Sequence, residues 1–442
     1  MKIQKYIMLI VVLFIGGASI HAQEIFSLED AIQTALENNH KIKIRRYDAQ
    51  IKAKQVNPAM VGARPTINAN ASYEFGWSDA SIETLNLASG GEATNTIELD
   101  GISNDVIIGA EISMTLLDGK ASKYRLEQLG QISQMAQLQI QQTIEQTVAS
   151  VSNAYLQMAQ QQAAIAITQQ SIALTNERLK RTKEDASYGT SSSLKYLQIE
   201  VDLKTDSATL NNQLLAYANA RRSLNQLMGQ APNTIFQVQA EVSSNRFLLL
   251  SELLSALRQN SVLLKLNNRN IELANIDVKL SQAAYKPRLQ AYANANFTYL
   301  QNNANFLQSN TTIGPNVGVR FQYPIFDWGA RKIKEESAVM IMEQRRMEQV
   351  DTEEYLIKEL YNAYATYENT IEQLRIEESN IGLFESNLDN MQNMYQMGTV
   401  TNTDVRSAQL NYNAAQNRIS NYQYLIKQAE VQLYLLSGQL VN

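Results

Sequence analysis

Residues that could support enzyme or metal chemistry are few in this chain. It has no cysteine and only two histidines, His21 and His40, so thiol nucleophiles, thiolate metal sites and multi-histidine sites have almost no material. The carboxylate pairs Glu335–Glu336 and Glu353–Glu354 lie among many other charges rather than in an apolar setting, which a glycosidase-type acid–base pair would need. We therefore expect no catalytic residue, no cofactor, no bound metal and no enzymatic activity.

The remaining candidates gather around two glycine turns, Gly189-Thr190 and Gly398-Thr399. Glycine adopts turn conformations that other residues resist. Lys195 stands six residues after the first glycine, and Asp404 stands six residues after the second. Asp404 can be read as a first-turn acid favoured by a helix N-terminus, or as a carboxylate that converges with its symmetry copies. Lys195 can be read as a solvated lysine or as a partner of that carboxylate.

The chain is built from two copies of one unit, which we place at about 23–229 and 249–442. Five landmarks recur in the same order, which predicts an internal duplication. The matched landmarks are Leu28, Ile32, Ala35, Leu36 and Asn39 with Leu249, Leu253, Ala256, Leu257 and Asn260; Arg64-Pro65 with Lys286-Pro287; Leu117-Asp118-Gly119 with Phe326-Asp327-Trp328-Gly329; Gly189-Thr190 with Gly398-Thr399; and Leu224, Leu227 and Gly229 with Leu433, Leu436 and Gly438. The intervening segment, about 230–248, is expected to form a small collar.

Four segments alternate apolar and polar residues with a period of two, which predicts β-strands. They cover about 65–77, 105–117, 287–300 and 315–326. Segments of about 10 residues are long enough to cross a bilayer as tilted strands. An ordinary sheet with one wet face is the alternative. We expect the acidic stretch from Ser78 to Asn104 to be a solvated external loop.

Two long helices are expected at about 120–187 and 330–397, because apolar residues recur there in steps of three and four. A helix of about 67 residues is roughly 100 Å long. Four shorter helices are expected as follows: about 27–62, 191–228, 249–285 and 401–437. The predicted class is thus an α+β membrane protein, mostly helical.

The N-terminus predicts export. Lys2 and Lys5 precede an apolar run, and small residues lead to a cleavage site after Ala22, so residues 1–22 are expected to be a signal peptide and 23–442 the mature subunit. The net charge is −5, which argues against nucleic acid as a partner. Four strands cannot close in lipid without leaving backbone groups unpaired, so strands from other copies are required. Three copies would give 12 strands.

Two segments form recognisable signatures: Pro324–Arg331 at a strand-to-helix junction, and Tyr395–Thr399 followed by Asp404-Val405 and Ala408-Gln409. In these segments the chain resembles the TolC family of outer-membrane efflux and secretion channels. The resemblance implies a homotrimer with a 12-stranded barrel in the outer-membrane lipid of a Gram-negative bacterium and a periplasmic α-helical barrel. It also implies a periplasmic membrane-fusion adaptor and an inner-membrane pump of the RND or ABC type, in efflux or type I secretion.

The resemblance also assigns site residues. Asp404 matches an aperture aspartate and Tyr395 matches a tyrosine of the aperture network, with Lys195 as a third aperture candidate. The next aperture aspartate is replaced by Ser407, and the network arginine by Val400. The turns Gly189, Thr190, Gly398 and Thr399 are expected to serve adaptor docking. Asp118, Gly119, Asp327 and Gly329 are expected at strand-to-helix junctions. The alternative function is a structural or adhesive coiled-coil protein of the envelope.

Overall fold

The computed structural model describes residues 25–85, 94–187, 193–239, 248–302 and 308–441. The expected signal peptide therefore lies outside the described residues. The chain divides into two compact units. One takes the described parts of Met1–Arg46, Leu138–Lys265 and Asp351–Asn442, and the other takes those of Tyr47–Gln137 and Leu266–Val350. The first unit is entirely helical apart from two short strands, whereas the second contains a four-stranded sheet.

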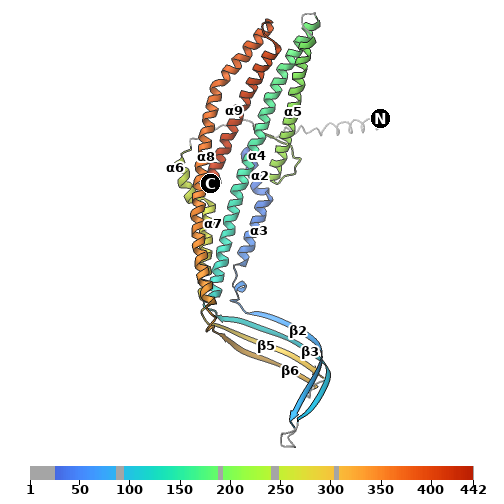
Figure 1. Ribbon diagram of the computed structural model, residues 1–442, viewed down its shortest axis with the longest axis vertical. Helices are drawn as coiled ribbons and strands as arrows, with labels where there is room; N and C mark the ends of the chain where they lie inside the picture. The colour runs from blue at the N-terminus through green and yellow to red at the C-terminus, as the bar shows by residue number, and fades with distance from the viewer. Residues whose placement is uncertain (1–24, 86–93, 188–192, 240–247, 303–307, 442) are drawn as a thin grey trace, which may run out of the picture. The chain divides into compact units, whose positions relative to one another are not determined.

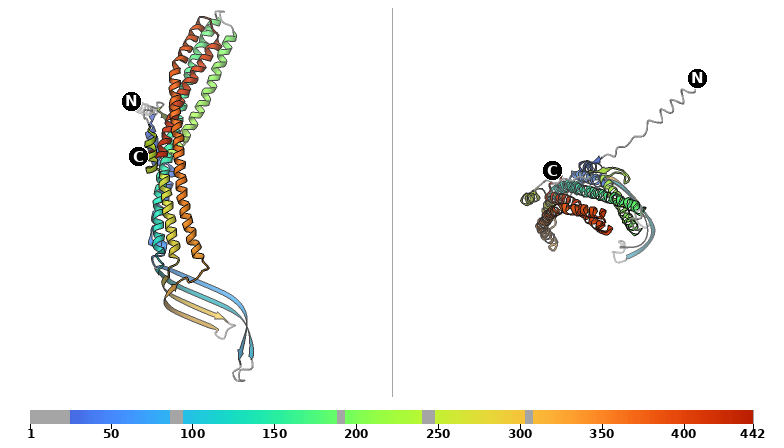
Figure 2. Two further views of the ribbon diagram at one scale, coloured as in Figure 1. Left: turned by 60° about the vertical axis from the view of Figure 1, so that its left-hand side comes forward. Right: turned by 90° about the horizontal axis from the view of Figure 1, so that it is seen from above.

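The two halves of the chain contain helices of matching length. The long helices α4 (Ala121–Ser187) and α8 (Ala330–Gln396) have 67 residues each. The helices that follow them, α5 (Ser193–Met228) and α9 (Asn402–Ser437), have 36 residues each. Figures 1 and 2 show α4 beside α5 and α8 beside α9, as two helical hairpins. The predicted mostly helical class is confirmed. None of the described helices combines the length and apolar character needed to cross a membrane.

The other two expected helices are each broken in two, which the sequence interpretation missed. The first consists of α2 (Leu28–Asn38) and α3 (His40–Gln55), and the second of α6 (Leu250–Asn260) and α7 (Val262–Ala283). At Asn39 the backbone leaves the helical region, with ψ of 125°. Its side chain accepts a hydrogen bond from the Lys41 amide and donates one to the Leu227 carbonyl, at 2.8 and 2.7 Å. A tertiary contact therefore fixes the break.

Glycines dock directly against these breaks. Gly229 has φ of +70°, and a Cβ atom there would lie 2.5 Å from the carbonyl oxygen of Asn38. Gly438, its counterpart in the second half, has φ of +69°, and its Cβ would lie 2.8 Å from the carbonyl carbon of Asn260. Both positions combine a left-handed backbone with a close approach of another chain segment, and only glycine meets both conditions without strain.

One core cluster of the helical unit forms where α4 meets α2 and α5, and another where α6 meets α8 and α9. Val151, Met158 and Leu224 are completely buried in the first cluster. Tyr155 also belongs to this cluster, and its hydroxyl donates to the Phe26 carbonyl and accepts from the Gln239 amide, at 2.9 and 3.0 Å. These two bonds secure the two-stranded parallel pair of β1 (Ile25–Phe26) and β4 (Gln237–Val238). Strand β4 lies in the segment that we expected to form a collar.

The sheet of the other unit has the order β2-β3-β5-β6, with antiparallel neighbours throughout (Figure 1). The strands are β2 (Thr66–Leu85), β3 (Thr94–Leu117), β5 (Arg288–Asn302) and β6 (Ser309–Gln322). The outer strands β2 and β6 each pair on one side only within the described chain. Two sheet edges are therefore open.

The first two strands are longer than expected. Much of the stretch from Ser78 to Asn104 belongs to β2 and β3, so the prediction of a loop over the whole stretch was wrong, while residues 86–93 lie outside the described part of the chain. Ile82 pairs with Ile97, and the constant register continues to Leu85 opposite Thr94. Backbone pairing joins the N–H and C=O groups of the two strands and does not require that the side chains be apolar. Similarly, β5 ends at Asn302 and β6 begins at Ser309, so both strands extend beyond the expected bounds of 300 and 315.

One face of the sheet is apolar and exposed. Many of the alternating residues on this face have large side chains that are not covered by the rest of the described chain; Val317 is 85% exposed. The exposed apolar side chains of this face are as follows: Ile67, Phe75, Trp77, Ile108, Ile112, Phe297, Ile313, Val317, Val319 and Phe321. A contiguous apolar surface of this kind indicates contact with lipid or with another chain.

Candidate functional site at the helical hairpins

The buried face of α4 changes from apolar to polar along its length. Toward the start of the helical unit the face carries Val148, Val151 and Tyr155. Farther along, the same steps of three and four residues bring polar side chains to the buried face: Thr168, Ser171, Thr175, Arg178 and Thr182. We call these five residues the polar seam. The seam itself buries little apolar surface, so its hydrogen bonds, together with the buried Ile199 of α5 and Val405 of α9, specify packing at this end of the helix.

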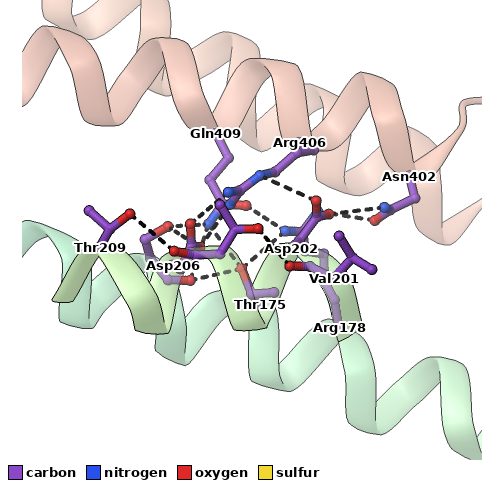
Figure 3. Close-up of polar contacts among 11 residues, drawn as sticks. Thr175, Arg178, Val201, Asp202, Asp206, Thr209, Asn402, Arg406 and Gln409 are labelled. Atoms are coloured by element: carbon purple, nitrogen blue, oxygen red, sulfur yellow. Dashed lines mark hydrogen bonds and ion pairs between the residues drawn. The ribbon is translucent and has the colours of Figure 1, made fainter. Parts of the chain in front are cut away.

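Helix α9 bonds to the polar seam through Gln409, which is fully buried (Figure 3). Its amide nitrogen donates to the hydroxyl and the carbonyl oxygen of Ser171, at 2.8 and 3.1 Å. Its amide oxygen accepts from a guanidinium nitrogen of Arg178. Arg178 also donates to Oδ1 of Asn402, at 3.2 Å. Burial lowers the pKa of Arg178, but from so high a value that the guanidinium keeps its charge.

Helix α9 is joined to α5 by an ion pair, also drawn in Figure 3. Arg406 donates two hydrogen bonds to the carboxylate of Asp206, at 2.8 and 2.6 Å. The side chains of this pair are 12% and 10% exposed. Asp202 lies 3.7 Å from the Arg406 guanidinium and accepts from the Asn402 amide at 3.4 Å. The hydrogen bonds to Asp206 raise the pKa of Arg406.

Together these contacts connect three helices. The members of this cluster, which we call the hairpin network, are Ser171, Thr175, Arg178, Asp202, Asp206, Asn402, Arg406 and Gln409. Asp206 also accepts a hydrogen bond from Ser171 at 3.2 Å, which closes the cluster between α4 and α5. The network has two cations and two carboxylates, so its charges balance. Such an arrangement can hold the two hairpins together and can be separated only by exposing its charges to water.

Asp404 lies in the first turn of α9, as predicted for an acid that stabilises a helix N-terminus. It forms a capping box with Thr401, whose amide and hydroxyl donate to the Asp404 carboxylate at 2.8 and 2.6 Å. These hydrogen bonds, the side-chain bond first, lower the pKa of Asp404. A first-turn carboxylate of this kind stabilises a helix N-terminus. Its further role in an aperture stays a prediction.

Tyr395 and Lys195 come together in the structure. Both line a pocket of about 500 Å³ beside the hairpin network, together with Arg178 and Gly398, whereas Asp404 is not among its lining residues. Gly398 ends α8 with φ of +75°. Its amide donates to the Tyr395 carbonyl and the Thr399 amide to the Met394 carbonyl, both at 3.0 Å, which is a Schellman ending. Gly189 and Thr190 lie outside the described residues.

The two strand-to-helix junctions use an aspartate in the same way. The Asp118 carboxylate accepts from the Ser122 amide at 2.6 Å, and the Asp327 carboxylate accepts from the amide and Nε of Arg331, at 3.1 and 2.6 Å. The hydrogen bond from the Arg331 side chain is the main reason that the pKa of Asp327 is lowered. The neighbouring Gly119 and Gly329 have φ of +65° and +83°. These four residues therefore shape the turns from sheet to helix.

Sequence reasoning missed the hairpin network. The available signal was the spacing of the polar seam, which continues the apolar steps of three and four residues without interruption. Arg406 was also overlooked, although it lies only two residues beyond Asp404. Among the described residues, no three His, Cys, Asp or Glu side chains gather in a way that could hold a metal ion.

The comparison with models of protein families identifies one family. The model of the outer membrane efflux protein family matches residues 31–230 and 253–439. The chain is similar in structure to the CmeC outer membrane channel of Campylobacter jejuni, with a TM-score of 0.73 at 15% identity over 93% of this chain and 86% of that one. It is also similar to the outer membrane protein VceC of Vibrio cholerae, with a TM-score of 0.69 at 15% identity over 93% and 96%.

A third similar structure is the open state of the MtrE outer membrane channel of Neisseria gonorrhoeae, with a TM-score of 0.68 at 18% identity over 93% of this chain and 89% of that one. A search of curated protein sequences finds no match. Efflux is transport rather than catalysis, so the family match supports a channel and not an enzyme. The match covers most of both halves, and the chain therefore belongs to the outer membrane efflux protein family.

Proposed function

We propose that this chain is one subunit of a homotrimeric duct that carries solutes through the outer membrane. The observation that carries the proposal is the sheet, with its exposed apolar face and its two open edges. In lipid, each unpaired backbone group at an open edge costs several kcal/mol. Strands from further copies would satisfy β2 and β6, and three copies of four strands make a barrel of 12, a size found among bacterial barrels.

The hairpins are the proposed gate, at the periplasmic end of the duct. The hairpin network keeps α4, α5 and α9 of one subunit together, and it lies beside the pocket that Tyr395 and Lys195 line. The polar seam makes this end of the bundle easier to separate than an apolar seam would, because α4 exposes little apolar surface when the helices part. Opening would exchange protein–protein hydrogen bonds for bonds to water, and each such exchange changes the free energy by only about 1 kcal/mol.

The turns that end the hairpins are the proposed docking points for a periplasmic adaptor, itself attached to an inner-membrane pump. Gly398 and Thr399 form one such turn and present a backbone that is closed by its own hydrogen bonds. Gly189 and Thr190 are the corresponding residues of the other hairpin. An adaptor would then bind at the end of the helices where their separation opens the duct.

The test is to purify the protein in detergent and to record its conductance in planar bilayers. A trimeric mass together with discrete single-channel currents is the expected result. A soluble monomer, or a trimer that never conducts in either orientation and at any voltage, would refute the duct. The second of these results would favour the structural or adhesive alternative.

A further inference from the structure

A second polar site lies in the sheet-containing unit, where the strands meet the helices. Two adjoining pockets of about 300 and 460 Å³ share Asp118, Arg125, Arg288 and Gln322 in their linings. The larger pocket adds Arg320, and the smaller adds Lys286. Four cationic side chains thus surround a space that contains a single carboxylate. We call Arg125, Lys286, Arg288 and Arg320 the basic cluster.

The charge of the basic cluster is not neutralised within the described chain. None of its four members forms an ion pair there. The one carboxylate, Asp118, already accepts from the amide and the hydroxyl of Ser122. The Arg320 guanidinium lies 5.3 Å from the centre of the Tyr292 ring, a contact that orients the cation but leaves its charge in place.

Strand register places the two strand arginines on the polar face of the sheet. Arg288 pairs with Gln322, and Gln290 pairs with Arg320, so all four side chains lie on one face. Their neighbours along the strands, Leu289, Val319 and Phe321, belong to the opposite, apolar face. The arginines therefore point away from the surface that we assign to lipid. In the proposed duct this polar face lines the water-filled passage.

The chemistry of these side chains suits an anion. Each guanidinium offers five N–H donors in a planar fork, which matches the oxygens of a carboxylate, sulfate or phosphate. The amides of Gln290 and Gln322 add neutral donors in the same pocket. Met60 and Val61 also line it, which provides an apolar neighbour for the carbon skeleton of an organic anion. No comparable group of unpaired carboxylates lines these pockets.

We propose that the basic cluster binds the anionic group of organic solutes as they pass from the helical part of the duct into the barrel. This inference rests on the proposed function, because it requires the polar face to line a passage. Three subunits would place three clusters around one axis, and clefts lined by a single sign of charge concentrate ions of the opposite sign. A lipid headgroup carries the same anionic chemistry, but it would reach the apolar side of the sheet.

The experiment compares the parent channel with the double variant R288Q/R320Q in planar bilayers, using 1-naphthalenesulfonate as the probe. The anion should reduce the parent current at a concentration about tenfold lower than it requires for the double variant. In a KCl gradient, the reversal potential of the variant should shift toward the potassium equilibrium potential. The uncharged analogue 1-naphthalenemethanol should affect the two channels equally.

Two further variants separate the effect of the charge from the effects of side-chain geometry and of position. Arg320→Lys retains the charge and loses the planar fork, so it should keep the parent's reversal potential and weaken the block. Arg222→Gln removes a positive charge from α5, where Arg222 is exposed and bonds to Asn219, and it should behave as the parent does. If the double variant did not assemble, the single variant Arg320→Lys would decide, because an unchanged block would then overturn the proposal.

The outcomes separate this inference from the proposed function. A parent channel that conducts but shows the same block and the same selectivity as R288Q/R320Q would overturn the anion site and leave the duct intact. A parent that never conducts would overturn both. Native mass spectrometry tests whether the basic cluster binds a lipid headgroup instead. If the double variant lost bound phospholipid while the naphthalenesulfonate block was unchanged, the cluster would hold a headgroup and the solute site would be refuted.

Discussion

At the scale of single residues, we expect substitution of Arg406 to weaken the hairpin network most. It neutralises two aspartates, Asp202 and Asp206, in a setting where Asp206 is nearly buried. Removing one member of a buried ion pair leaves the other charge without compensation, at a cost of about 3 kcal/mol. We predict that Arg406→Ala loosens the hairpins: hydrogen exchange at the start of α9 should become faster, and the mean single-channel conductance should rise.

The double variant Arg406→Ala/Asp206→Ala serves as the internal control for this prediction. It removes both charges of the bidentate pair, so it should recover part of the lost protection against exchange. Arg222→Ala, which disrupts only the bond to Asn219 at an exposed position, should leave exchange in α9 unaltered. Arg406→Ala with parental exchange rates and conductance would show that the hairpin network does not hold the hairpins together.

Asp404 has two separable roles, and a neighbouring residue distinguishes them. Asp404→Ala removes both the capping box and the carboxylate, whereas Thr401→Ala removes the cap and keeps the charge. Thr401→Ala should destabilise the start of α9 by about 1 kcal/mol, and Asp404→Ala should also destabilise it. We predict that only Asp404→Ala lowers cation selectivity in planar bilayers, with the trimer intact, and that Lys195→Glu raises it and loosens closure. If Asp404→Ala and Lys195→Glu both kept the selectivity and conductance of the parent, neither residue would lie at the constriction.

The pH dependence of the cap follows from the lowered pKa of Asp404. A carboxyl whose pKa is lower in the folded protein contributes stability above its unfolded value, and that contribution is lost as the pH falls through the folded value. The cap should therefore be fully formed at neutral pH and should weaken only below the ordinary value of 3.8. Hydrogen exchange of α9 that responded to pH between 5 and 8 would point to other groups.

At the scale of elements, the long helices could be predicted from the sequence, whereas the contacts that join them could not. The residues of α4 and α8 repeat in steps of three and four over their whole length, and no tertiary contact is needed to recognise that pattern. The break at Asn39 depends on a bond to Leu227, far along the chain. The hairpin network has the same character, because Gln409 is buried only through its bonds to α4. When the contact with α4 is not known, a glutamine on a helix is expected to be exposed to water.

The glycines at the helix breaks give a prediction at this scale. Gly229→Ala would place a methyl group 2.5 Å from the Asn38 carbonyl at a residue with φ of +70°, so α5 and α2 must move apart. We predict a lower temperature of trimer dissociation, measured by electrophoresis after stepwise heating. Gly130→Ala is the matched control, because a Cβ there meets nothing within 4 Å. In mid-helix that substitution should stabilise α4 by up to about 1 kcal/mol. Equal behaviour of the two variants would contradict the close approach.

At the scale of the whole molecule, the two halves of the chain share one plan but differ at their hairpins. Both halves supply a pair of strands to one sheet and a hairpin of helices. The hairpin network is nevertheless not symmetric, because its arginines are Arg178 on α4 and Arg406 on α9, and its aspartates are both on α5. The halves have therefore diverged at the hairpins, where the proposed gate lies, while the lengths of their helices have remained equal.

The assignment of the two faces of the sheet leads to the last prediction, on assembly. Ala110 lies on the apolar face, paired with Ala69 on one side and Ala295 on the other. Asn294 lies on the opposite, polar face, and its side-chain oxygen accepts from the Asn316 amide at 3.3 Å. An arginine on the lipid side of a barrel near mid-membrane costs roughly 2–4 kcal/mol, whereas positions facing the lumen tolerate charge. Ala110→Arg should therefore reduce the amount of heat-resistant trimer recovered from outer-membrane fractions, and Asn294→Arg should leave it near the parental level. Equal recovery of the two variants would contradict the face assignment, and a loss confined to Asn294→Arg would reverse it.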